Sequence, residues 1–435
     1  MTPDSIPAPL LAACSGVRLA GPADSVAGAG PSYVASPAST PEASAVMRAA
    51  ASLGLAVLPR GSGTRLDWGA APRRCDLVIE TTRMDSVLEH AAGDQVARVQ
   101  AGTSIEQLAA VLRTAGQQLA LDPPPGTGAG AREAAGAGEA AGAGTGTVGG
   151  VLATGVAGPR RLRYGAPRDL LIGITVIRAD GTVAKAGGKV VKNVAGYDIG
   201  KLFAGSYGTL GLITEAVFRL HPLPAASVFV TLDCADAAAA HAVMSAAVAS
   251  PLAPSAAEID WPGRGTPIRA GVLFEGDPAG APERAERMRE LLGGAAVICD
   301  TPPPWWGLGA AAAGDGTVIR IGFWAAELPR VLAAIRAAAA AAGLDPAVGG
   351  SAAAGVIHAA VQEHAAPAEV AEFLTALRAA IGRSRASAVV LHAPPGVREV
   401  IDMWGPVPSL GLMRAVKDQF DPEHRMAPGR FAGGI

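Results

Sequence analysis

A glycine- and hydroxyl-rich segment near the start of the chain has the composition of an anion-binding loop. The stretch "PRGSGTRLDWG" runs from Pro59 to Gly69 and follows an apolar run that is typical of a strand. Small residues let successive backbone N–H groups converge on one anion, and Ser62 and Thr64 add hydroxyl donors. The cation of Arg60 or Arg65 would offset the charge of two phosphates. The loop predicts a pyrophosphate site, although the same residues also fit a tight surface turn. The candidate ligands are Arg60, Gly61, Ser62, Gly63 and Thr64.

Two further glycine-rich segments follow in the same half of the chain. One, "GTVGGVLATGVAGPRRLRYGAPRDLLIG", spans Gly146–Gly173, and the other, "GGKVVKNVAGYDIGKLFAGSYGTLGLITEA", spans Gly187–Ala216. Glycine in regular structure costs about 0.5–1 kcal/mol relative to alanine, so its repeated use indicates close backbone approach or positive φ. Thr147 and Thr154 offer hydroxyl donors, and the small residues around them leave room for a flat ligand. Three such segments favour one shared ligand over three unrelated turns.

The glycine spacing excludes the two commonest nucleotide-binding motifs. No segment has the G-x-G-x-x-G pattern followed by a helix and an acidic residue, which marks a dinucleotide-binding Rossmann unit. No segment ends in the Gly-Lys-Ser/Thr of a phosphate-binding P-loop. A nucleotide bound here would therefore be held by a different arrangement of backbone.

The elements that would position these segments are short helices and strands. Thr40 is the expected N-cap of a helix that has Pro41 in its first turn and ends at Gly54. Ser104 is expected to cap a second helix, which follows an alternating strand. Asp180-Gly181 indicates a two-residue hairpin between the strands on either side of it.

From Ala225 onward strands and helices alternate. The runs "SVFVTLDC", "IRAGVLFEG", "TVIRIGFW", "GVIHAAV" and "ASAVVLHA" are typical of strands, and alanine-rich runs between them are typical of helices. Short antiparallel strands with helices on one face would fit this pattern. The expected helices are residues 235–250, 282–293, 332–341, 366–381 and 410–420.

Composition divides the chain into parts. The alanine-, proline- and serine-rich start is expected to be loosely ordered. The first domain is expected to end where Pro222 and Pro224 stop a strand. It contains a low-complexity Gly/Ala-rich insertion at 126–146, which we expect to be a flexible surface loop. The C-terminal helix and tail are expected to return to this domain. The parts are a loosely ordered N-terminus (1–38), a first domain (39–224), a second domain (225–406) and the C-terminal part (407–435).

Overall composition narrows the class of protein. The chain has 435 residues, of which 50% are hydrophobic, and a formal net charge of −2, so a sizeable core is expected and a nucleic-acid partner is not. The four cysteines are far apart and form no C-x-x-C, which predicts free thiols rather than disulfides or an iron–sulfur cluster. No 18-residue apolar run and no basic leader are visible, so we expect a soluble, cytoplasmic protein.

Several of these motifs together resemble a known family. "GTVGG", "GPRRLRYGAPRDLLIG" and "KNVAGYDIGKLFAGSYGTLGLITEAVFRLHPLP" resemble the FAD-binding domain of the vanillyl-alcohol oxidase and p-cresol methylhydroxylase superfamily. Within it, "GPRR", "KNVAGYD", "GSYGTLG" and the tail "LMRAVKDQFDPEHRMAPGRFAGGI" resemble the smaller FAD-binding (E-type) subunit of bacterial glycolate oxidases. The likeness covers about residues 40–225 by motif, and the remainder by length, by Trp404-Gly405 and by the tail. It implies an α+β fold in which a two-part FAD-binding domain of the p-cresol methylhydroxylase type precedes an α+β cap (substrate) domain with an antiparallel sheet.

The resemblance implies that the three glycine segments wrap one extended FAD. The first would meet the pyrophosphate, and the second would follow the pyrophosphate, the ribityl chain and the isoalloxazine. The strand holding Gly211–Ile213 would bring backbone against the flavin or the adenosine end. Asn193 and Tyr197 would stabilise the crossing before that strand, although Tyr197 also fits an ordinary core aromatic. The further candidate FAD residues are Thr147, Val148, Gly149, Gly150, Thr154, Gly158, Tyr164, Asn193, Gly211 and Ile213.

Two departures from the family pattern affect the cofactor. Several relatives tether the flavin through a histidine or a cysteine, but the glycine segments of this chain contain neither. We therefore expect non-covalent FAD. The tail reads "MAPGR" where Asn-Pro-Gly is common, so an amide contact near the flavin is expected to be missing at Ala427.

Oxidation of a 2-hydroxy acid, which the resemblance implies, needs a base for the hydroxyl proton and a cation for the carboxylate. His358 in "GVIHAAV" and His392 in "VVLHAPP" lie on or beside expected strands and are the candidate bases, although either also fits a satisfied structural histidine. Arg161, between Arg160 and Arg163, is the candidate for the carboxylate. These arginines also fit neutralisation of the FAD phosphates or a partner surface. We see no paired-histidine pattern and expect no metal.

The same resemblance implies partners. Because this chain lacks iron–sulfur ligands, another subunit would pass electrons to a quinone or carrier. A larger FAD-binding subunit and an iron–sulfur subunit are implied, and they would place the chain peripherally at the inner membrane. The implied function is oxidation of glycolate to glyoxylate in such a complex. A stand-alone FAD-dependent dehydrogenase of another hydroxy acid or alcohol is one alternative, and a flavin-holding or electron-relay subunit without its own substrate site is another. "PPPWWGLG" (Pro302–Gly309) fits either a partner surface or, preferably, a cover over the domain interface.

Overall fold

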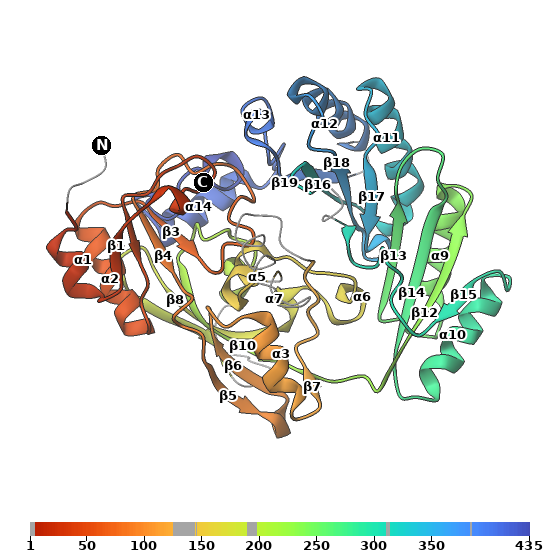
Figure 1. Ribbon diagram of the computed structural model, residues 1–435, viewed down its shortest axis with the longest axis horizontal. Coiled ribbons are helices and arrows are strands. Elements are labelled where there is room, and N and C mark those ends of the chain that lie inside the picture. The colour runs from red at the N-terminus through yellow and green to blue at the C-terminus, as the bar shows by residue number, and fades with distance from the viewer. Residues whose placement is uncertain (1–4, 125–143, 145, 189–197, 310–313, 383–384) are drawn as a thin grey trace.

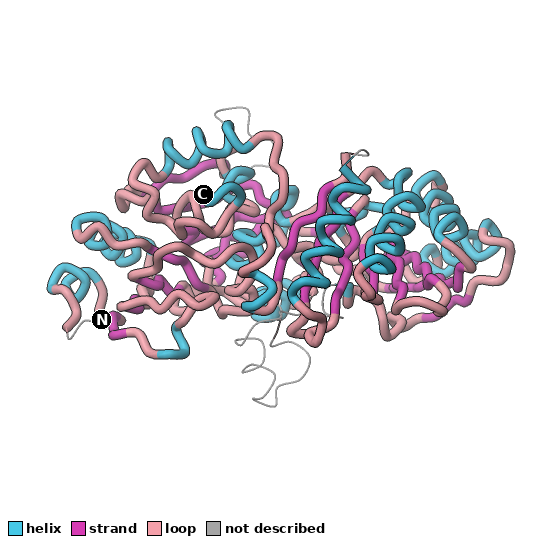
Figure 2. The backbone as a smooth tube through the Cα atoms, turned by 90° about the horizontal axis from the view of Figure 1, so that it is seen from above, coloured by secondary structure: helices cyan, strands magenta, loops and turns pink. Residues whose placement is uncertain are grey.

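A computed structural model describes residues 5–124, 144, 146–188, 198–309, 314–382 and 385–435. Over these residues the chain has an α+β fold, as the sequence predicts, with four β-sheets. The sheets lie in two lobes side by side (Figures 1 and 2). Three of the sheets are built from strands before Ala226, and the largest is built from strands after it.

The first sheet has the order β1-β2-β4-β3, with β2, β4 and β3 parallel. Its N-terminal part is ordered rather than loose, because Leu10 and Val34 are completely buried in the core of this region. The N-cap of α2 is Ser39 and not Thr40: the Ser39 hydroxyl accepts a hydrogen bond from the backbone N–H of Glu42. The elements are α1 (Ala8–Ala13), β1 (Val17–Leu19), β2 (Tyr33–Ala35), α2 (Thr40–Ser52), β3 (Val57–Arg60) and β4 (Leu77–Glu80).

The second sheet is antiparallel, with the order β5-β6-β10-β8-β9. The hairpin between β8 and β9 is longer than the two residues expected, because Arg178 and Thr182 pair through their backbone and Gly181 takes a φ of 83°. The elements are β5 (Val87–Ala91), β6 (Val96–Gln100), α3 (Ile105–Arg113), α5 (Val148–Thr154), α6 (Arg161–Tyr164), α7 (Pro167–Leu170), β8 (Leu171–Ile177), β9 (Val183–Gly187), α8 (Gly200–Phe203) and β10 (Leu212–Arg219). A small pair joins β7 (Gln117–Gln118) to β11 (His221–Pro222).

The largest sheet is antiparallel, with the order β15-β12-β14-β13-β17-β18-β16-β19. Four helices cover the face that points away from the other lobe (Figure 1), as the alternating pattern predicts. The strands are β12 (Ala226–Cys234), β13 (Ala256–Trp261), β14 (Ile268–Gly276), β15 (Val297–Cys299), β16 (Thr317–Gly322), β17 (Ala347–Gly350), β18 (Val356–Val361) and β19 (Ser387–His392). The helices are α9 (Ala237–Ala249), α10 (Gly280–Leu291), α11 (Leu328–Ala341) and α12 (Pro367–Ile381), and the short α13 (Pro395–Arg398) follows β19.

The C-terminal segment lies against the first lobe, far from its neighbours in sequence (Figure 1). Helix α14 (Leu410–Phe420) carries the fully buried Lys417. Its ammonium group donates to the carboxylate of Asp421 at 2.7 Å, and to the backbone oxygens of Thr209 at 2.7 Å and Met426 at 2.8 Å. The backbone N–H of Ala427 then donates to the oxygen of Val57 in β3. The tail thus braces both β3 and the loop that precedes β10.

The cysteines and the paired tryptophans can be placed in the structure. All four cysteines are free, and three of them are buried. Trp305 and Trp306 lie on the inner face of the large sheet, where Trp306 meets Phe229 edge-to-face at 5.0 Å and both rings lie over Gly271. This placement favours the interpretation that the pair covers the interface between the lobes. Within the described residues, no helix has the length and apolarity to cross a bilayer.

Candidate functional site

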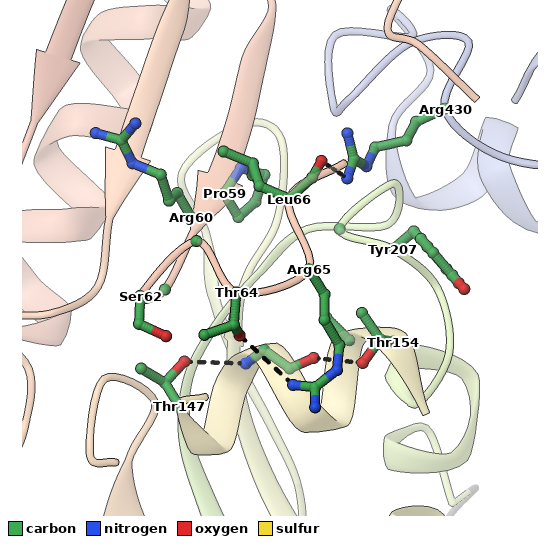
Figure 3. A pocket seen from close by; sticks show the side chains of 15 residues that line it. Pro59, Arg60, Ser62, Thr64, Arg65, Leu66, Thr147, Thr154, Tyr207 and Arg430 are labelled. Carbon is green, nitrogen blue, oxygen red and sulfur yellow. Dashed lines mark hydrogen bonds between the residues drawn. The ribbon is translucent and has the colours of Figure 1, made fainter. Parts of the chain in front are cut away.

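A cleft opens where the loop after β3 faces α5 and the loop before β10 (Figure 3). The first glycine-rich segment lines one wall, and the second and third line the opposite wall. A second hollow adjoins it, sharing Gly61, Gly150 and Gly208 and extending toward the start of β10. The lining residues are Pro59, Arg60, Gly61, Ser62, Gly63, Thr64, Arg65, Leu66, Thr81, Thr147, Gly149, Gly150, Ala153, Thr154, Tyr207, Gly208, Gly211, Leu212, Ile213 and Arg430.

The loop after β3 presents unused backbone donors to this cleft. Among the described residues, the N–H groups of Gly61, Ser62, Gly63 and Thr64 have no hydrogen-bond acceptor. Gly63 has a φ of 80°, and a Cβ added there would have no heavy atom within 4 Å, so its missing side chain leaves open space. Consecutive free donors beside open space are the arrangement that a phosphate or another anion satisfies.

Helix α5 packs tightly under the loop because small residues meet at the contact. A Cβ on Gly61 would lie 2.2 Å from the Thr147 hydroxyl, and one on Gly149 would lie 2.9 Å from the Cβ of Ala101. Thr147 caps the helix by accepting from the N–H of Gly150 at 3.2 Å. Val148, a candidate cofactor residue, is only 1% exposed and belongs to the core under the cleft. Its side chain therefore packs in the core rather than lining the cleft.

Two buried arginines, rather than Arg60, supply the positive charge of the cleft. Arg60 points away from it and pairs with Asp24 at 2.8 Å and with Glu80 at 2.5 Å (Figure 3). Arg65 is 6% exposed and Arg430 is 4% exposed. Burial lowers the pKa of each to about 10, which leaves both cationic at neutral pH.

Arg430 was not found by sequence reasoning. Its Nη1 atom has no hydrogen-bond partner among the described residues, while another nitrogen donates to the backbone oxygen of Leu66 (Figure 3). The tail motif "PGR" contains this arginine, and it was the one sequence feature that could have pointed to it. The arginine reaches the cleft only because the tail returns to β3. A buried cation with an unused donor facing a cleft requires an anionic or strongly polar ligand.

The third segment closes the cleft from the side of β10. The N–H of Tyr207 donates to the oxygen of Ala153 at 2.8 Å, and the N–H of Gly205 donates to Leu152 at 2.9 Å, so this loop is fastened to α5. Gly211 and Ile213 line the adjoining hollow. Asn193, like the neighbouring Tyr197, lies outside the described residues. The structure thus brings most of the candidate cofactor residues of all three segments to one cleft.

A separate pocket lies between the two lobes and holds two of the candidate catalytic residues. It is lined by Gly158 and Arg161 from the first lobe, and by Glu258, Ser351 and His358 from the large sheet. The Nδ1 atom of His358 is buried without a hydrogen-bond partner among the described residues. Burial and then the nearby guanidinium groups lower the pKa of His358 to about 3, so its ring is neutral at neutral pH.

Two residues with ionisable side chains, one lining this pocket and one beside it, were missed in the sequence because neither belongs to a motif. The carboxyl of Glu258 accepts a hydrogen bond from the Ser351 hydroxyl, and burial raises its pKa to about 8. Arg320 on β16 pairs in register with His358 on β18, which places the two side chains on the same face of the sheet. Residue 158 must be a glycine for a packing reason as well, because a Cβ there would lie 1.8 Å from the backbone oxygen of Asp122.

Two candidate residues have other roles. Both ring nitrogens of His392 face oxygens: Nδ1 lies 2.8 Å from the oxygen of Gly316, and Nε2 lies 2.7 Å from Asp67. Both ring nitrogens are thus engaged within the protein, and His392 links the large sheet to the loop after β3. Tyr164 donates to Glu275 at 3.3 Å in a different hollow, so it does not contact the cleft.

An extended nucleotide with a pyrophosphate fits this donor set. The loop after β3 offers consecutive amides and two buried cations, and the adjoining hollow toward β10 extends the cleft in one direction. Within the described residues, no cluster of histidine, cysteine and carboxylate side chains is arranged to hold a metal ion. The cleft therefore suits a phosphate-bearing cofactor.

Comparisons with known proteins agree with this chemistry. Residues 31–139 and 131–187 match the family described as "FAD binding domain". The glycolate oxidase subunit GlcD of Bacillus subtilis is 34% identical over 194 residues, which cover 45% of this chain and 38% of the relative. The glycolate oxidase subunit GlcE of Escherichia coli is 39% identical over 126 residues, or 29% of this chain and 31% of the relative. The D-lactate dehydrogenase of Archaeoglobus fulgidus is 36% identical over 189 residues, or 43% and 38%.

These curated relatives are matched over less than half of their length. The fold is also that of a solved alkyldihydroxyacetonephosphate synthase, at a TM-score of 0.66 and 18% identity, with 92% of this chain and 78% of that chain covered. Residues 31–187 of this chain therefore match an FAD-binding domain, and the chain is similar over part of its length to a glycolate oxidase subunit and a D-lactate dehydrogenase.

Proposed function

We propose that this chain binds one FAD non-covalently in the cleft and acts as an FAD-dependent oxidoreductase of 2-hydroxy acids, with glycolate as its substrate. The observation that carries the proposal is the row of free amides from Gly61 to Thr64 beside the buried cations of Arg65 and Arg430. Such a row satisfies a pyrophosphate without any covalent tether, and the described residues that line the cleft include no histidine or cysteine.

Within this proposal each segment has a separate task. The loop after β3 and the hydroxyls of Ser62 and Thr64 hold the phosphates, and α5 supports the loop through Thr147. The hollow beside Gly211 and Ile213 takes one end of the cofactor. When bound, FAD supplies an acceptor for the hydride of a hydroxyl-bearing carbon. The chain's own residues fix the position of the cofactor and exclude water around it.

The pocket between the lobes is the proposed place for the substrate. Arg161 from α6 and His358 from β18 both line it, so a carboxylate and a hydroxyl group have a cation and a neutral imidazole to meet there. The relatives whose names state a substrate act on glycolate, D-lactate or D-2-hydroxyglutarate, which supports a 2-hydroxy acid. The choice of glycolate follows from the motifs shared with the E-type subunit.

We further propose that the chain works inside a complex. Two of the relatives are named as glycolate oxidase subunits, which supports a larger FAD-binding subunit as partner. The four free cysteines form no iron–sulfur ligand set, so an iron–sulfur subunit would carry the electrons onward. In this assembly residues 39–224 with the tail 407–435 form the FAD domain, and residues 225–406 form the cap.

The experiment is purification of the full chain followed by absorbance spectroscopy. We expect a flavin spectrum at one FAD per chain, with all of the flavin released by acid or denaturant. Anaerobic glycolate should bleach the spectrum, faster than D-lactate does. A colourless protein that does not take up added FAD would refute the cofactor assignment, and a bound flavin that no 2-hydroxy acid reduces, alone or with the co-purified partners, would favour an electron-relay subunit.

A further inference from the structure

The pocket between the lobes has an unbalanced positive charge. Neither Arg161 nor Arg320 has a side-chain hydrogen bond or an ion pair among the residues that the structure describes. Arg161 from α6 and Glu258 from β13 line the pocket, and Arg320 from β16 lies beside it, opposite His358 on the adjacent strand. The charge of Arg320 acts on both His358 and Arg161, and the carboxyl groups of Asp122 and Asp169 also act on Arg161. Glu258 brings no counter-charge at neutral pH, because burial raises its pKa to about 8 and keeps it protonated. One guanidinium group thus lines the pocket and a second, from the opposite lobe, lies beside it, while the carboxyl group that lines the pocket is uncharged.

The Nδ1 atom of His358 is buried and has no hydrogen-bond partner among the described residues. Two glycines pack beside it without side chains: a Cβ on Gly309 would lie 3.2 Å from Nδ1, and one on Gly350 would lie 3.4 Å from it. Arg320 and His358 are directly opposite each other on adjacent strands. The positive charges of Arg320 and Arg161 both disfavour the protonated ring, in addition to burial.

We propose that this pocket binds the carboxylate of a small acid between Arg161 and Arg320, and that the bound anion increases the affinity of His358 for a proton. The inference rests on the proposed function, because it names the ligand class and the regulation of the same site. A bound carboxylate cancels the field of the two cations, so the imidazolium is no longer repelled and the neutral ring becomes a stronger acceptor for the proton of the ligand's hydroxyl group.

This coupling would give the site a selectivity that geometry alone does not. A ligand without a negative charge would leave His358 neutral and weakly basic. A carboxylate would create the proton acceptor that its own neighbouring hydroxyl group needs. Binding of the acid and activation of the base are then one event, and neutral alcohols would be poor ligands even where they fit the pocket.

The test uses oxalate, which is anionic and has no C–H bond to oxidise, with oxamide as the neutral probe. Histidine side chains of the full flavin-loaded protein are labelled with ¹⁵N, and the His358 signals are assigned by their loss in His358→Gln. We expect the apparent pKa of His358 to rise by at least one unit when oxalate saturates the site, which is a tenfold gain in proton affinity. Oxamide should cause no shift. No oxalate-dependent shift at His358 would overturn the proposal.

The variant Arg320→Gln separates the cause from a general effect of binding. Its oxalate affinity should fall at least tenfold, and the pKa of His358 in the ligand-free variant should already be higher than in the natural protein. Arg330→Gln is the matched control, because Arg330 is exposed on α11 and pairs only with Glu327. Equal oxalate affinity in the two variants would contradict the proposed binding of the carboxylate between Arg161 and Arg320.

Flavin absorbance recorded on the same samples separates this inference from the proposed function. A protein that holds flavin and is reduced by glycolate, but shows no oxalate-linked change at His358, would refute the inference alone. A protein that binds oxalate with the predicted rise in the pKa of His358 but takes up no FAD would refute the cofactor proposal. The proposed carboxylate site would not be affected by that result.

Discussion

The substitution Gly63→Ala tests whether the loop after β3 holds the cofactor. Gly63 has a φ of 80°, a region that alanine enters at a cost of about 1–2 kcal/mol. An added Cβ meets no protein atom within 4 Å. The unfolding free energy of the flavin-free protein should therefore fall only by this cost of the backbone conformation. The new methyl group would occupy the space where the proposed phosphate accepts hydrogen bonds.

The loss of FAD affinity can be worked out from that geometry. Displacing one charge-assisted hydrogen bond between a phosphate oxygen and a backbone N–H costs about 1.5–3 kcal/mol. Because about 1.4 kcal/mol corresponds to a factor of ten, the dissociation constant should rise about tenfold to a hundredfold. The assay is titration of the flavin-free protein with FAD, followed by flavin fluorescence, with urea unfolding of the same flavin-free samples.

Gly54→Ala is the matched control. Gly54 has a φ of 61° and also has no atom within 4 Å of an added Cβ, but it lies between α2 and β3 and does not line the cleft. Both variants should lose a similar free energy of unfolding, and only Gly63→Ala should lose FAD affinity. If the two variants bind FAD equally well, the reasoning about this loop is wrong.

Three further substitutions address particular groups. In Glu258→Gln the hydrogen bond from Ser351 is kept but the titration is lost: burial raises the pKa of Glu258 from 4.5 to about 8, so the natural protein should lose about 2 kcal/mol of unfolding free energy between pH 6 and pH 8, whereas the variant should lose little. A parallel pH dependence in both, by urea unfolding, would contradict that burial. Ala427→Gly should raise the unfolding free energy by about 1 kcal/mol, because Ala427 has a φ of 41°. His392→Gln should lower it by about 2 kcal/mol through loss of the pair with Asp67, with no change in the pH profile of glycolate oxidation. A shifted profile would return His392 to the list of candidate bases.

Sequence patterns identified the loop with free backbone donors but not the charged side chains around it. The small residues from Gly61 to Thr64 indicated an anion site because the donors are backbone N–H groups of the segment itself. Such a site does not depend on side chains from distant parts of the chain. The choice between Arg60 and Arg65 depended on Asp24, which pairs with Arg60 and lies in a part expected to be loosely ordered. That part is ordered because its apolar side chains are buried. Its composition, rich in alanine, proline and serine, did not indicate this burial.

The catalytic candidates show the same limit. His358 and His392 occupy similar places on predicted strands, and only their neighbours separate them. The partner of His392 is Asp67, which lies in the other lobe and shares no motif with it. Arg320 and Glu258 are single polar residues in apolar strands. Nothing in their spacing reveals that Glu258 lines the pocket around His358 or that Arg320 lies opposite His358 on the adjacent strand. Pairings between lobes are fixed by tertiary packing, which a local pattern does not encode.

Hydrogen–deuterium exchange of the full chain with and without FAD tests the central claim most directly, namely that three separated segments enclose one cofactor. We predict that FAD slows exchange in the peptides that contain residues 61–66, 148–155 and 205–213 together, with the same half-saturating FAD concentration for all three. Protection of only one of these peptides, or protection at different concentrations, would contradict the account.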